Sequence, residues 1–272
     1  MTARAFINDH RKPLRVIAAV VAFAMIAVLL EFANELLGNP VSYLIAKNNA
    51  KKYVEEKYPG AGYVIESVDY SFKFKDYFAR AAKPGSEDCY FTVFYNMFGE
   101  FRGDNFTVLV ENGGNVERRL ETGYRQLADS VLESSANPYR TERAIQFGEL
   151  IFESDPEKPE SYDFGLSRDI LVPDGQYDLA ELGAEGGLIV FNVDVQGEAT
   201  PEKAAEVLLK VREIMERGGV PFFAIDLALK SPSGNYYLEN FHRADIYEDG
   251  LAERVRQKGM TTEEFNAHGE AK

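Results

Sequence analysis

The stretch Val16–Leu30, VIAAVVAFAMIAVLL, decides how the chain is organised, because it contains no charged residue, no glycine and no proline. As a helix, these residues would rise about 22 Å, and apolar neighbours such as Leu14 and Leu36 lengthen the apolar run. With some tilt, that length spans a bilayer. A helix that is apolar all round also has no polar side to present to water. The sequence therefore predicts a transmembrane anchor over residues 16–37.

Two other interpretations of this stretch remain open, a cleaved secretory signal and a buried soluble helix. A cleaved signal needs small residues before the cut, whereas the chain reads Leu30-Glu31-Phe32-Ala33 there. No cysteine follows the apolar run, which excludes a lipoprotein anchor. We therefore favour an uncleaved signal anchor. Its basic flank, made of Arg4, Arg11, Lys12 and Arg15, predicts a cytoplasmic tail at residues 1–15 and an extracytoplasmic remainder.

Composition limits the partners of the extracytoplasmic part. The chain carries 44 acidic and 30 basic residues, a formal net charge of −14 at pH 7. Such an acidic surface repels nucleic acid and anionic lipid headgroups, so we expect no nucleic-acid partner. Cys89 is the one cysteine, which excludes an intramolecular disulfide and a cysteine-based metal site. The three histidines, His10, His242 and His268, lack the spacing of a metal-binding helix.

The fold class predicted after the anchor is α+β, as two small domains at residues 40–113 and 114–272. In the first, Ser42 is expected to cap a helix that ends near Tyr58, before Pro59-Gly60. Alternating residues then predict an antiparallel meander. Its expected strands are centred on Val68–Phe74, on Tyr77–Ala82, on Cys89–Tyr95 with Cys89 in the core, and on Phe98–Phe101.

The second domain is expected to begin at the break Asn112–Asn115. Helices are predicted at 116–135 and from Thr200-Pro201 to Gly218-Gly219, where a hydroxyl cap, a proline and a glycine stop mark the ends. Leu188–Val195 is apolar enough for a central strand. The other expected elements are a strand at 144–152, a loop at 154–159, a short segment at 177–182, a turn at Gly183–Gly187, a hairpin of 222–230 with 236–241, and a tail that is helical or frayed from Asp249 and disordered beyond Glu264.

The candidate site residues are three carboxylates, Asp194, Asp226 and Glu239, which fall in three predicted strands. If they meet on one sheet face, they form an acid/base pair or a divalent cation site. The alternative is that they mark the solvated side of the sheet. His242, three residues after Glu239, is expected at the surface or at the edge of the core. No serine or cysteine sits in a strand-to-helix elbow, so a hydrolase triad is not indicated.

Four motifs carry a resemblance to a known family. They are Gly38-Asn39-Pro40 after the anchor, the AKKYVEEKYP run at Ala50–Pro59, YSFKF at Tyr70–Phe74, and RRLETGYRQ at Arg118–Gln126. In this order they resemble the YfjL-like family, membrane-anchored proteins of Gram-positive bacteria. The resemblance covers the first half of the chain. It implies a membrane location and an α+β fold, and it brings no catalytic or ligand residues. The helix-then-meander layout is also similar to PepSY-type and cystatin-like modules, a likeness of topology.

Two function hypotheses of different class follow. The first is a non-enzymatic envelope binding or regulatory module that engages a protein, a peptide or a wall component, with peptidase modulation as a narrower form. The second is a metal-dependent or acid/base enzyme that uses Asp194, Asp226 and Glu239. We prefer the first, without a cofactor or a metal, because the chain shows no motif for either.

Overall fold

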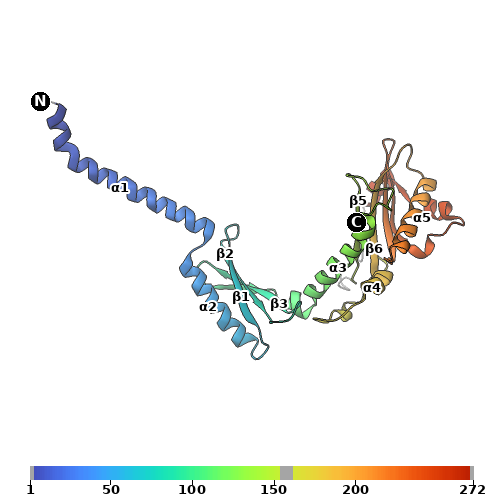
Figure 1. Ribbon diagram of the computed structural model, residues 1–272, viewed down its shortest axis with the longest axis horizontal. Helices are drawn as coiled ribbons and strands as arrows, with labels where there is room; N and C mark the ends of the chain where they lie inside the picture. The colour runs from blue at the N-terminus through green and yellow to red at the C-terminus, as the bar shows by residue number, and fades with distance from the viewer. Residues whose placement is uncertain (1–2, 154–161, 270–272) are drawn as a thin grey trace. The chain divides into compact units, whose positions relative to one another are not determined.

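The structure is a computed structural model that describes residues 3–153 and 162–269. The predicted loop at 154–159 lies outside the described residues. The chain forms two compact units, Met1–Glu111 and Asn112–Lys272, and each is described by itself. Figure 1 labels their helices and strands.

The first unit begins with α1 (Ala3–Leu37), which contains the whole of the apolar stretch. Among the described residues, α1 is the helix that is long and apolar enough to cross a membrane, and none of its most apolar part is buried. The helix ends at Gly38, whose φ of 76° lies in the left-handed region. A Cβ at Gly38 would come within 2.7 Å of the Tyr70 ring. The junction therefore needs glycine for both its backbone angle and its close packing.

The next helix, α2 (Pro40–Lys57), starts two residues earlier than the predicted Ser42 cap. Asn39 is the cap, because its Oδ1 accepts the Val41 N–H at 2.8 Å. Pro40 fits the first helical position, where no N–H partner is required. Ala46, Ala50 and Val54 are buried. Their spacing makes the stripe that α2 lays on the sheet.

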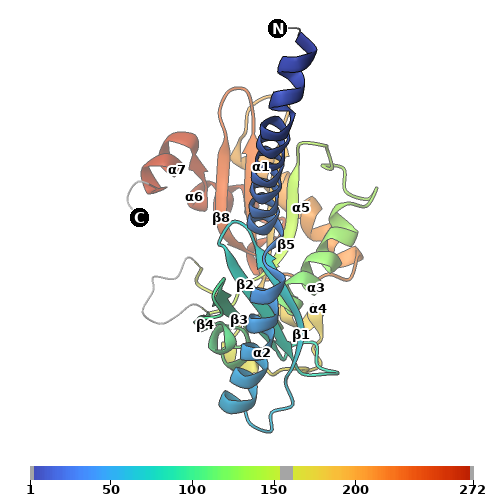
Figure 2. The same cartoon turned by 90° about the vertical axis from the view of Figure 1, so that its left-hand side faces the viewer.

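Four antiparallel strands in sequential order form the sheet of this unit: β1 (Val64–Ser71), β2 (Asp76–Ala82), β3 (Tyr90–Asn96) and β4 (Phe101–Asp104). Figure 2 shows α2 lying along this sheet. Residues Tyr77, Phe91, Val93 and Tyr95 face the helix and are almost fully buried. A π-helical turn, Thr107–Glu111, ends the unit.

Three predictions for this sheet were wrong in detail. The first strand ends at Ser71 rather than at Phe74, because residues 72–75 form the turn into β2. Cys89 is not on β3 but precedes it and is only partly buried, because the turn holds its backbone: the Cys89 N–H donates to Ser86 Oγ at 2.8 Å. The fourth strand begins at Phe101 rather than Phe98. Residues 97–100 instead form a tight turn, in which Asn96 Oδ1 accepts the backbone N–H groups of Phe98 and Glu100, each at 2.9 Å.

The second unit has five helices and five strands among its described residues. The helices are α3 (Gly114–Leu132), α4 (Leu179–Gly186), α5 (Pro201–Arg217), α6 (Leu251–Lys258) and α7 (Thr262–Gly269). The strands are β5 (Ile145–Leu150), β6 (Gly187–Asp194), β7 (Ala224–Lys230), β8 (Tyr236–His242) and β9 (Met260–Thr261). Short 3₁₀ turns lie at Arg168–Ile170 and Arg243–Asp245.

These strands form one sheet in sequential order from β5 to β9. Three of its four pairings are antiparallel, and β6 with β7 is parallel. A parallel pair needs a crossover connection, which here is α5. The α+β fold class is confirmed, because both units combine helices with a mainly antiparallel sheet.

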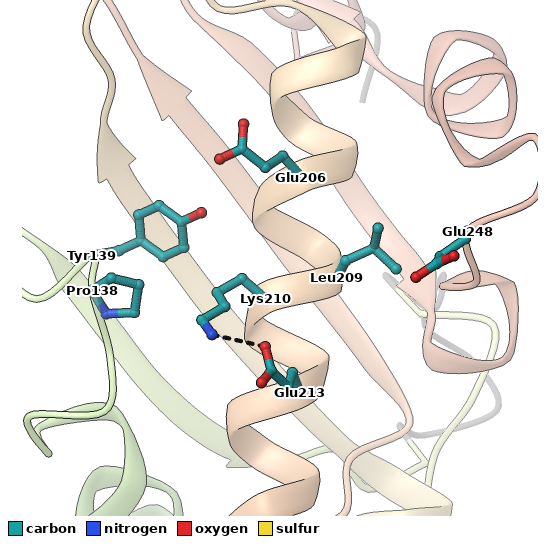
Figure 3. A pocket seen from close by; sticks show the side chains of 7 residues that line it. All are labelled: Pro138, Tyr139, Glu206, Leu209, Lys210, Glu213 and Glu248. Atoms are coloured by element: carbon teal, nitrogen blue, oxygen red, sulfur yellow. Dashed lines mark hydrogen bonds and ion pairs between the residues drawn. The ribbon is translucent and has the colours of Figure 1, made fainter.

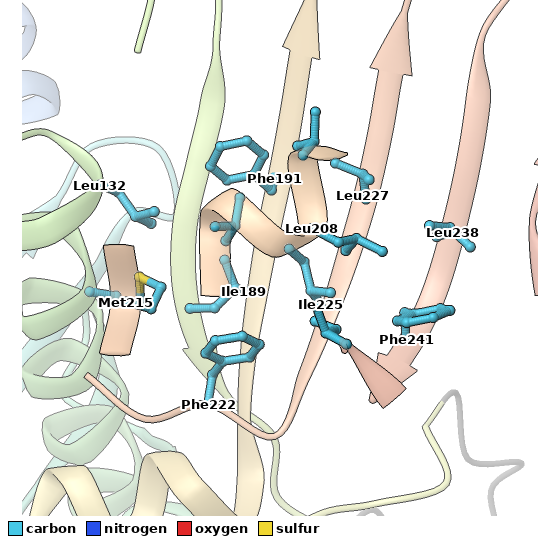
Figure 4. Packing of buried hydrophobic residues seen from close by; sticks show 14 of the residues in the cluster. Leu132, Ile189, Phe191, Leu208, Met215, Phe222, Ile225, Leu227, Leu238 and Phe241 are labelled. Atoms are coloured by element: carbon cyan, nitrogen blue, oxygen red, sulfur yellow. The ribbon is translucent and has the colours of Figure 1, made fainter. Parts of the chain in front are cut away.

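One face of this sheet packs against α3 and α5. Figure 4 shows the apolar side chains between sheet and helices, among them Ile189, Phe191, Ile225, Leu208 and Met215. All five are fully buried, with 0% of their surface exposed. Burying each such side chain contributes about 1.5–3 kcal/mol. Since this face is apolar, the polar residues of β6, β7 and β8 are left on the opposite face.

Two further predictions differ from the structure. Gly183–Gly186 lies in the last turn of α4 rather than in a free turn; a Cβ at Gly183 would come within 2.3 Å of the Tyr124 ring, so close helix packing explains the glycine. The chain beyond Glu264 was expected to be disordered, but α7 runs to Gly269. It packs through Phe265, whose ring stacks on Tyr237 with centroids 4.2 Å apart.

Candidate functional site

The predicted carboxylates lie on the sheet face opposite α3 and α5. Side chains alternate along a strand, and Ile189 and Ile225 point to the helical core. Asp194 is five residues after Ile189 on β6, and Asp226 directly follows Ile225 on β7, so both carboxylates lie on the other face. Glu239 of β8 lies on that face as well. Among the described residues, the three sequence-based candidates therefore lie on the same sheet face.

Asp226 and Glu239 are brought together by an irregularity in β8. The register of β7 with β8 shifts between Ile225 and Leu227, so that Asp226 faces the Glu239–Asn240 step. Asn240 has a φ of 51°, and its backbone N–H donates to Asp226 Oδ1 at 2.8 Å. Such a bulge re-aims side chains, and here it turns a backbone donor toward the carboxylate. The Asn240 N–H thus gives a backbone hydrogen bond to the Asp226 carboxylate, which is largely shielded from water.

Glu149 and Tyr162 complete this group, and neither was predicted from the sequence. Glu149 is on β5, and the Tyr162 hydroxyl hydrogen-bonds the Asp226 carboxylate. Burial raises the pKa of Asp226 to about 6; the Asn240 N–H opposes this rise, while the charges of Glu239 and Glu149 add to it. Burial and the same three carboxylates raise the pKa of Tyr162 to about 12. We call these four residues, Glu149, Tyr162, Asp226 and Glu239, the carboxylate cluster.

Asp194 does not belong to the carboxylate cluster. It is exposed at the end of β6 and lies opposite Lys230, whereas Asp226 lies opposite Val190. Four residues along a strand correspond to about 13 Å. The structure thus joins two of the three predicted site residues and separates the third.

The carboxylate cluster has the chemistry of a proton carrier more than that of a metal site. A carboxyl group with a pKa near 6 can exchange a proton close to neutral pH. Across residues 3–153 and 162–269, no group of three His, Cys, Asp or Glu side chains has an arrangement that could hold a metal ion.

His242 lies at the end of β8 on this face, at the margin of a small aromatic group. Its Nε2 is 3.1 Å from Asp163 Oδ1. Its ring meets Phe223 edge to face, with centroids 5.0 Å apart, and Phe223 stacks on Phe164 at 4.7 Å. These contacts make His242 a half-buried edge residue, in agreement with the sequence-based expectation.

A separate groove runs along the outer side of α5 (Figure 3). Its volume is about 630 Å³, in the range of ligand pockets. The lining residues are Pro138, Tyr139, Glu206, Leu209, Lys210, Glu213 and Glu248. Lys210 is paired with Glu213 at 2.7 Å, as the dashed line in Figure 3 marks. The groove combines an aromatic wall with a net negative charge, and no sequence motif indicated it.

The comparisons with known proteins cover both units. Residues 13–105 match the YfjL-like N-terminal domain, and residues 124–256 match the YfjL-like C-terminal domain. The chain belongs to the YfjL-like family. Comparison with curated proteins and with solved structures gives no match.

The family assignment confirms the resemblance and extends it into the second half of the chain. The N-terminal YfjL-like match includes the apolar stretch of α1 together with α2 and the first sheet. The C-terminal YfjL-like match includes the carboxylate cluster and every residue of the groove. The two family matches assign no catalytic or ligand-binding residue to this YfjL-like chain, so the geometry of the carboxylate cluster and of the groove is what bears on its function.

Proposed function

We propose that this YfjL-like protein is a membrane-anchored, extracytoplasmic binding or regulatory protein rather than an enzyme. The observation that carries the proposal is α1, whose 35 residues include the apolar stretch without a single buried side chain in its most apolar part. A helix that finds no protein partner for such a surface is suited to lipid.

The orientation follows from charge. Arg11, Lys12 and Arg15 precede the apolar stretch, whereas Glu31 and Glu35 follow it. Basic residues are retained on the cytoplasmic side. The N-terminus is therefore placed in the cytoplasm and both folded units outside the membrane.

The groove on α5 supports a binding role for the second unit. Its wall is formed by Tyr139, whose ring is held edge to face against Phe191 at 5.9 Å. The Tyr139 ring and the Leu209 side chain offer apolar contact to a partner. The glutamates along α5 favour a partner with cationic groups. Such a groove fits a segment of an envelope protein or peptide.

The second candidate function, an acid/base activity, is supported by one observation, the raised pKa of Asp226 in the carboxylate cluster. Perturbed carboxyl groups occur at catalytic sites, but they also arise wherever an acid is buried beside other acids. Burial is the largest cause here. We therefore keep the binding role as the proposal.

Protease treatment of intact cells tests the proposed location. The full chain, with an epitope tag after Lys272, is expressed in a Gram-positive host, and proteinase K is added outside. The tag signal should be lost from intact cells, while a cytoplasmic marker protein survives. A tag that survives in intact cells and is lost only after lysis would show that the two units lie inside, against the proposal.

A further inference from the structure

Exposed apolar side chains gather at the end of the first unit from which α1 emerges. They come from the end of α1, the first residues of α2, and the β1–β2 and β3–β4 turns of the sheet. They are Phe32, Leu37, Val41, Leu44, Phe72, Phe74 and Phe98, each at least 56% exposed. Scattered apolar residues are normal on a protein surface, but a group of this kind at one location marks an interaction site.

Strand register places the two turns at the same end of the sheet. Ser71 pairs with Asp76, and Asp76 pairs with Asn96, so the β1–β2 turn (residues 72–75) and the β3–β4 turn (residues 97–100) are neighbours. The second turn is tied to α2, because Asn49 Nδ2 donates to the Gly99 carbonyl at 2.8 Å.

The β1–β2 turn is also fixed to the last turns of α1. Lys75 Nζ lies 2.6 Å from the Glu35 carboxylate. The Tyr70 hydroxyl donates to the Glu35 carbonyl at 3.3 Å. Glu35 is two residues before the end of α1. The turn therefore lies level with the part of α1 that leaves the apolar stretch.

The turn carries two lysines, Lys73 and Lys75, between the acidic residues Asp69 and Asp76. Lys75 is paired with Glu35, so Lys73 is the cation that the turn can offer to a partner. Lys73 Nζ lies 5.4 Å from the centre of the Phe74 ring. A long basic side chain beside an exposed aromatic ring suits a lipid–water interface, where the ring enters the apolar layer and the ammonium group stays with the phosphates.

We propose that the β1–β2 turn docks into the headgroup layer of the same bilayer that α1 crosses. Phe72 and Phe74 enter the outer part of the acyl layer, and Lys73 lies at the lipid phosphates. The bilayer is the fitting occupant because the turn is tied to the end of the membrane helix and presents two exposed phenylalanines beside Lys73. This inference rests on the proposed function, since it needs α1 in the membrane. It turns a single-helix tether into a two-point attachment that sets the orientation of the first unit.

Tryptophan fluorescence of the full-length protein tests the docking, because the natural chain contains no tryptophan. Three single variants are reconstituted in vesicles of phosphatidylcholine and phosphatidylglycerol, with part of the lipid brominated near the glycerol end of its acyl chains. Phe72→Trp reports on the turn. Val64→Trp, at the opposite end of β1 and about 26 Å away by strand rise, is the matched control. Phe23→Trp, in the middle of α1, reports on the anchor with lipid brominated deep in the chain.

The docking predicts bromine quenching of Phe72→Trp at least about fivefold stronger than that of Val64→Trp, since interfacial groups lie about 5–10 Å inside the boundary. Emission of Phe72→Trp should also shift to the blue on reconstitution. If Phe23→Trp is quenched while Phe72→Trp matches the control, docking is overturned and the anchor stands. If neither is quenched, the anchor itself is overturned. Shielding of Phe72→Trp from aqueous acrylamide without bromine quenching shows a protein cover instead of lipid, and also overturns the docking.

Discussion

The Tyr77 hydroxyl and the backbone of Asn39 hold each other through two hydrogen bonds. The hydroxyl accepts the Asn39 N–H at 2.6 Å and donates to the Asn39 carbonyl at 2.9 Å. Asn39 stands between α1 and α2, and Tyr77 is a buried residue of β2. This pair therefore connects the exit of the apolar helix to the first sheet, so that the position of α1 and the folding of the first unit depend on each other.

Tyr77→Phe should weaken this junction. The change leaves the Asn39 N–H without its acceptor, which costs about 1–3 kcal/mol for a group shielded from water. Hydrogen exchange of the full chain, read by mass spectrometry, should show faster exchange in peptides of β2 and the start of α2. Tyr43→Phe is the matched control, because the Tyr43 hydroxyl makes no hydrogen bond among the residues that the structure describes. Equal exchange in the two variants would show that the junction does not depend on this pair.

Asp104→Asn should destabilise the edge of the first sheet at neutral pH. Burial raises the pKa of Asp104, but hydrogen bonds from Tyr53, from the Phe106 N–H and from Lys57 outweigh burial and lower it below the ordinary value of 3.8. A lowered pKa contributes stability above the ordinary value that is lost as pH falls. We expect a cost of about 1–3 kcal/mol at pH 7 and a smaller one in acid, measured by exchange of α2 and β4 peptides. The control is Glu66→Gln, which removes the half-exposed Arg80–Glu66 pair and should cost less than about 1 kcal/mol.

Asp226→Asn should stabilise the second unit above pH 6. Burial raises the pKa of Asp226 from 3.8 to about 6 in the folded state. The folded protein then binds a proton that the unfolded chain releases, so its stability is highest below pH 4 and falls as pH rises through 6. Asparagine keeps an oxygen for the Asn240 N–H and removes the charge. Thermal unfolding between pH 4 and pH 8 should therefore show that the variant has the free energy of unfolding of the natural chain at pH 4. At pH 7 its free energy of unfolding should be higher by about 1–3 kcal/mol. Asp194→Asn is the control, and a gain at pH 7 no larger than the control's would contradict the assignment.

Divalent cations should have little specific effect on the second unit. The cluster joins Asp226 with Glu239 and Glu149, but the described residues offer no three-ligand metal arrangement. Millimolar calcium should shift the melting temperature of the natural chain and of the Asp226→Asn/Glu239→Gln variant by the same small amount, since a specific site would stabilise only the former by mass action. A saturable calcium response that the double variant lacks would favour the enzymatic hypothesis.

Local signals in the sequence were enough to predict much of the fold. Thr200-Pro201 and Gly218 bracket α5 because a hydroxyl cap, a proline and a glycine act within a few residues. The apolar run at Leu188–Val195 corresponds to β6, which lies between β5 and β7 as expected of a central strand. Burial on both faces was not correct, because Asn192 is half-buried and Asp194 is exposed on the face opposite the helices. Asn39 was missed as the cap of α2 because Ser42 is an equally good capping residue in isolation, although Pro40 at the first helical position is a local signal for Asn39. The contact with Tyr77 adds a tertiary tie at the same residue.

The site was less predictable, because it depends on register. Asp226 and Glu239 meet only through the irregularity at Asn240, and a one-residue change of pairing moves a side chain to the other face of a sheet. Asp194 shares their face but not their level along the strands. The alternation of side chains in β5 would have placed Glu149 in the carboxylate cluster if the pairing of β5 with β6 had been known. Tyr162 follows no periodic pattern, and its place beside Asp226 is a matter of tertiary structure.

Alkaline carbonate extraction shows whether α1 crosses the membrane and holds both units to it. Membranes from cells that express the full chain are washed with sodium carbonate, which releases peripheral proteins. The account predicts that the protein stays in the pellet, and that a variant with three charges in the apolar stretch, Val20→Asp/Phe23→Lys/Ile26→Asp, moves to the supernatant, because each central charge costs about 2.5–3.5 kcal/mol on insertion. Release of the natural chain by carbonate would contradict it.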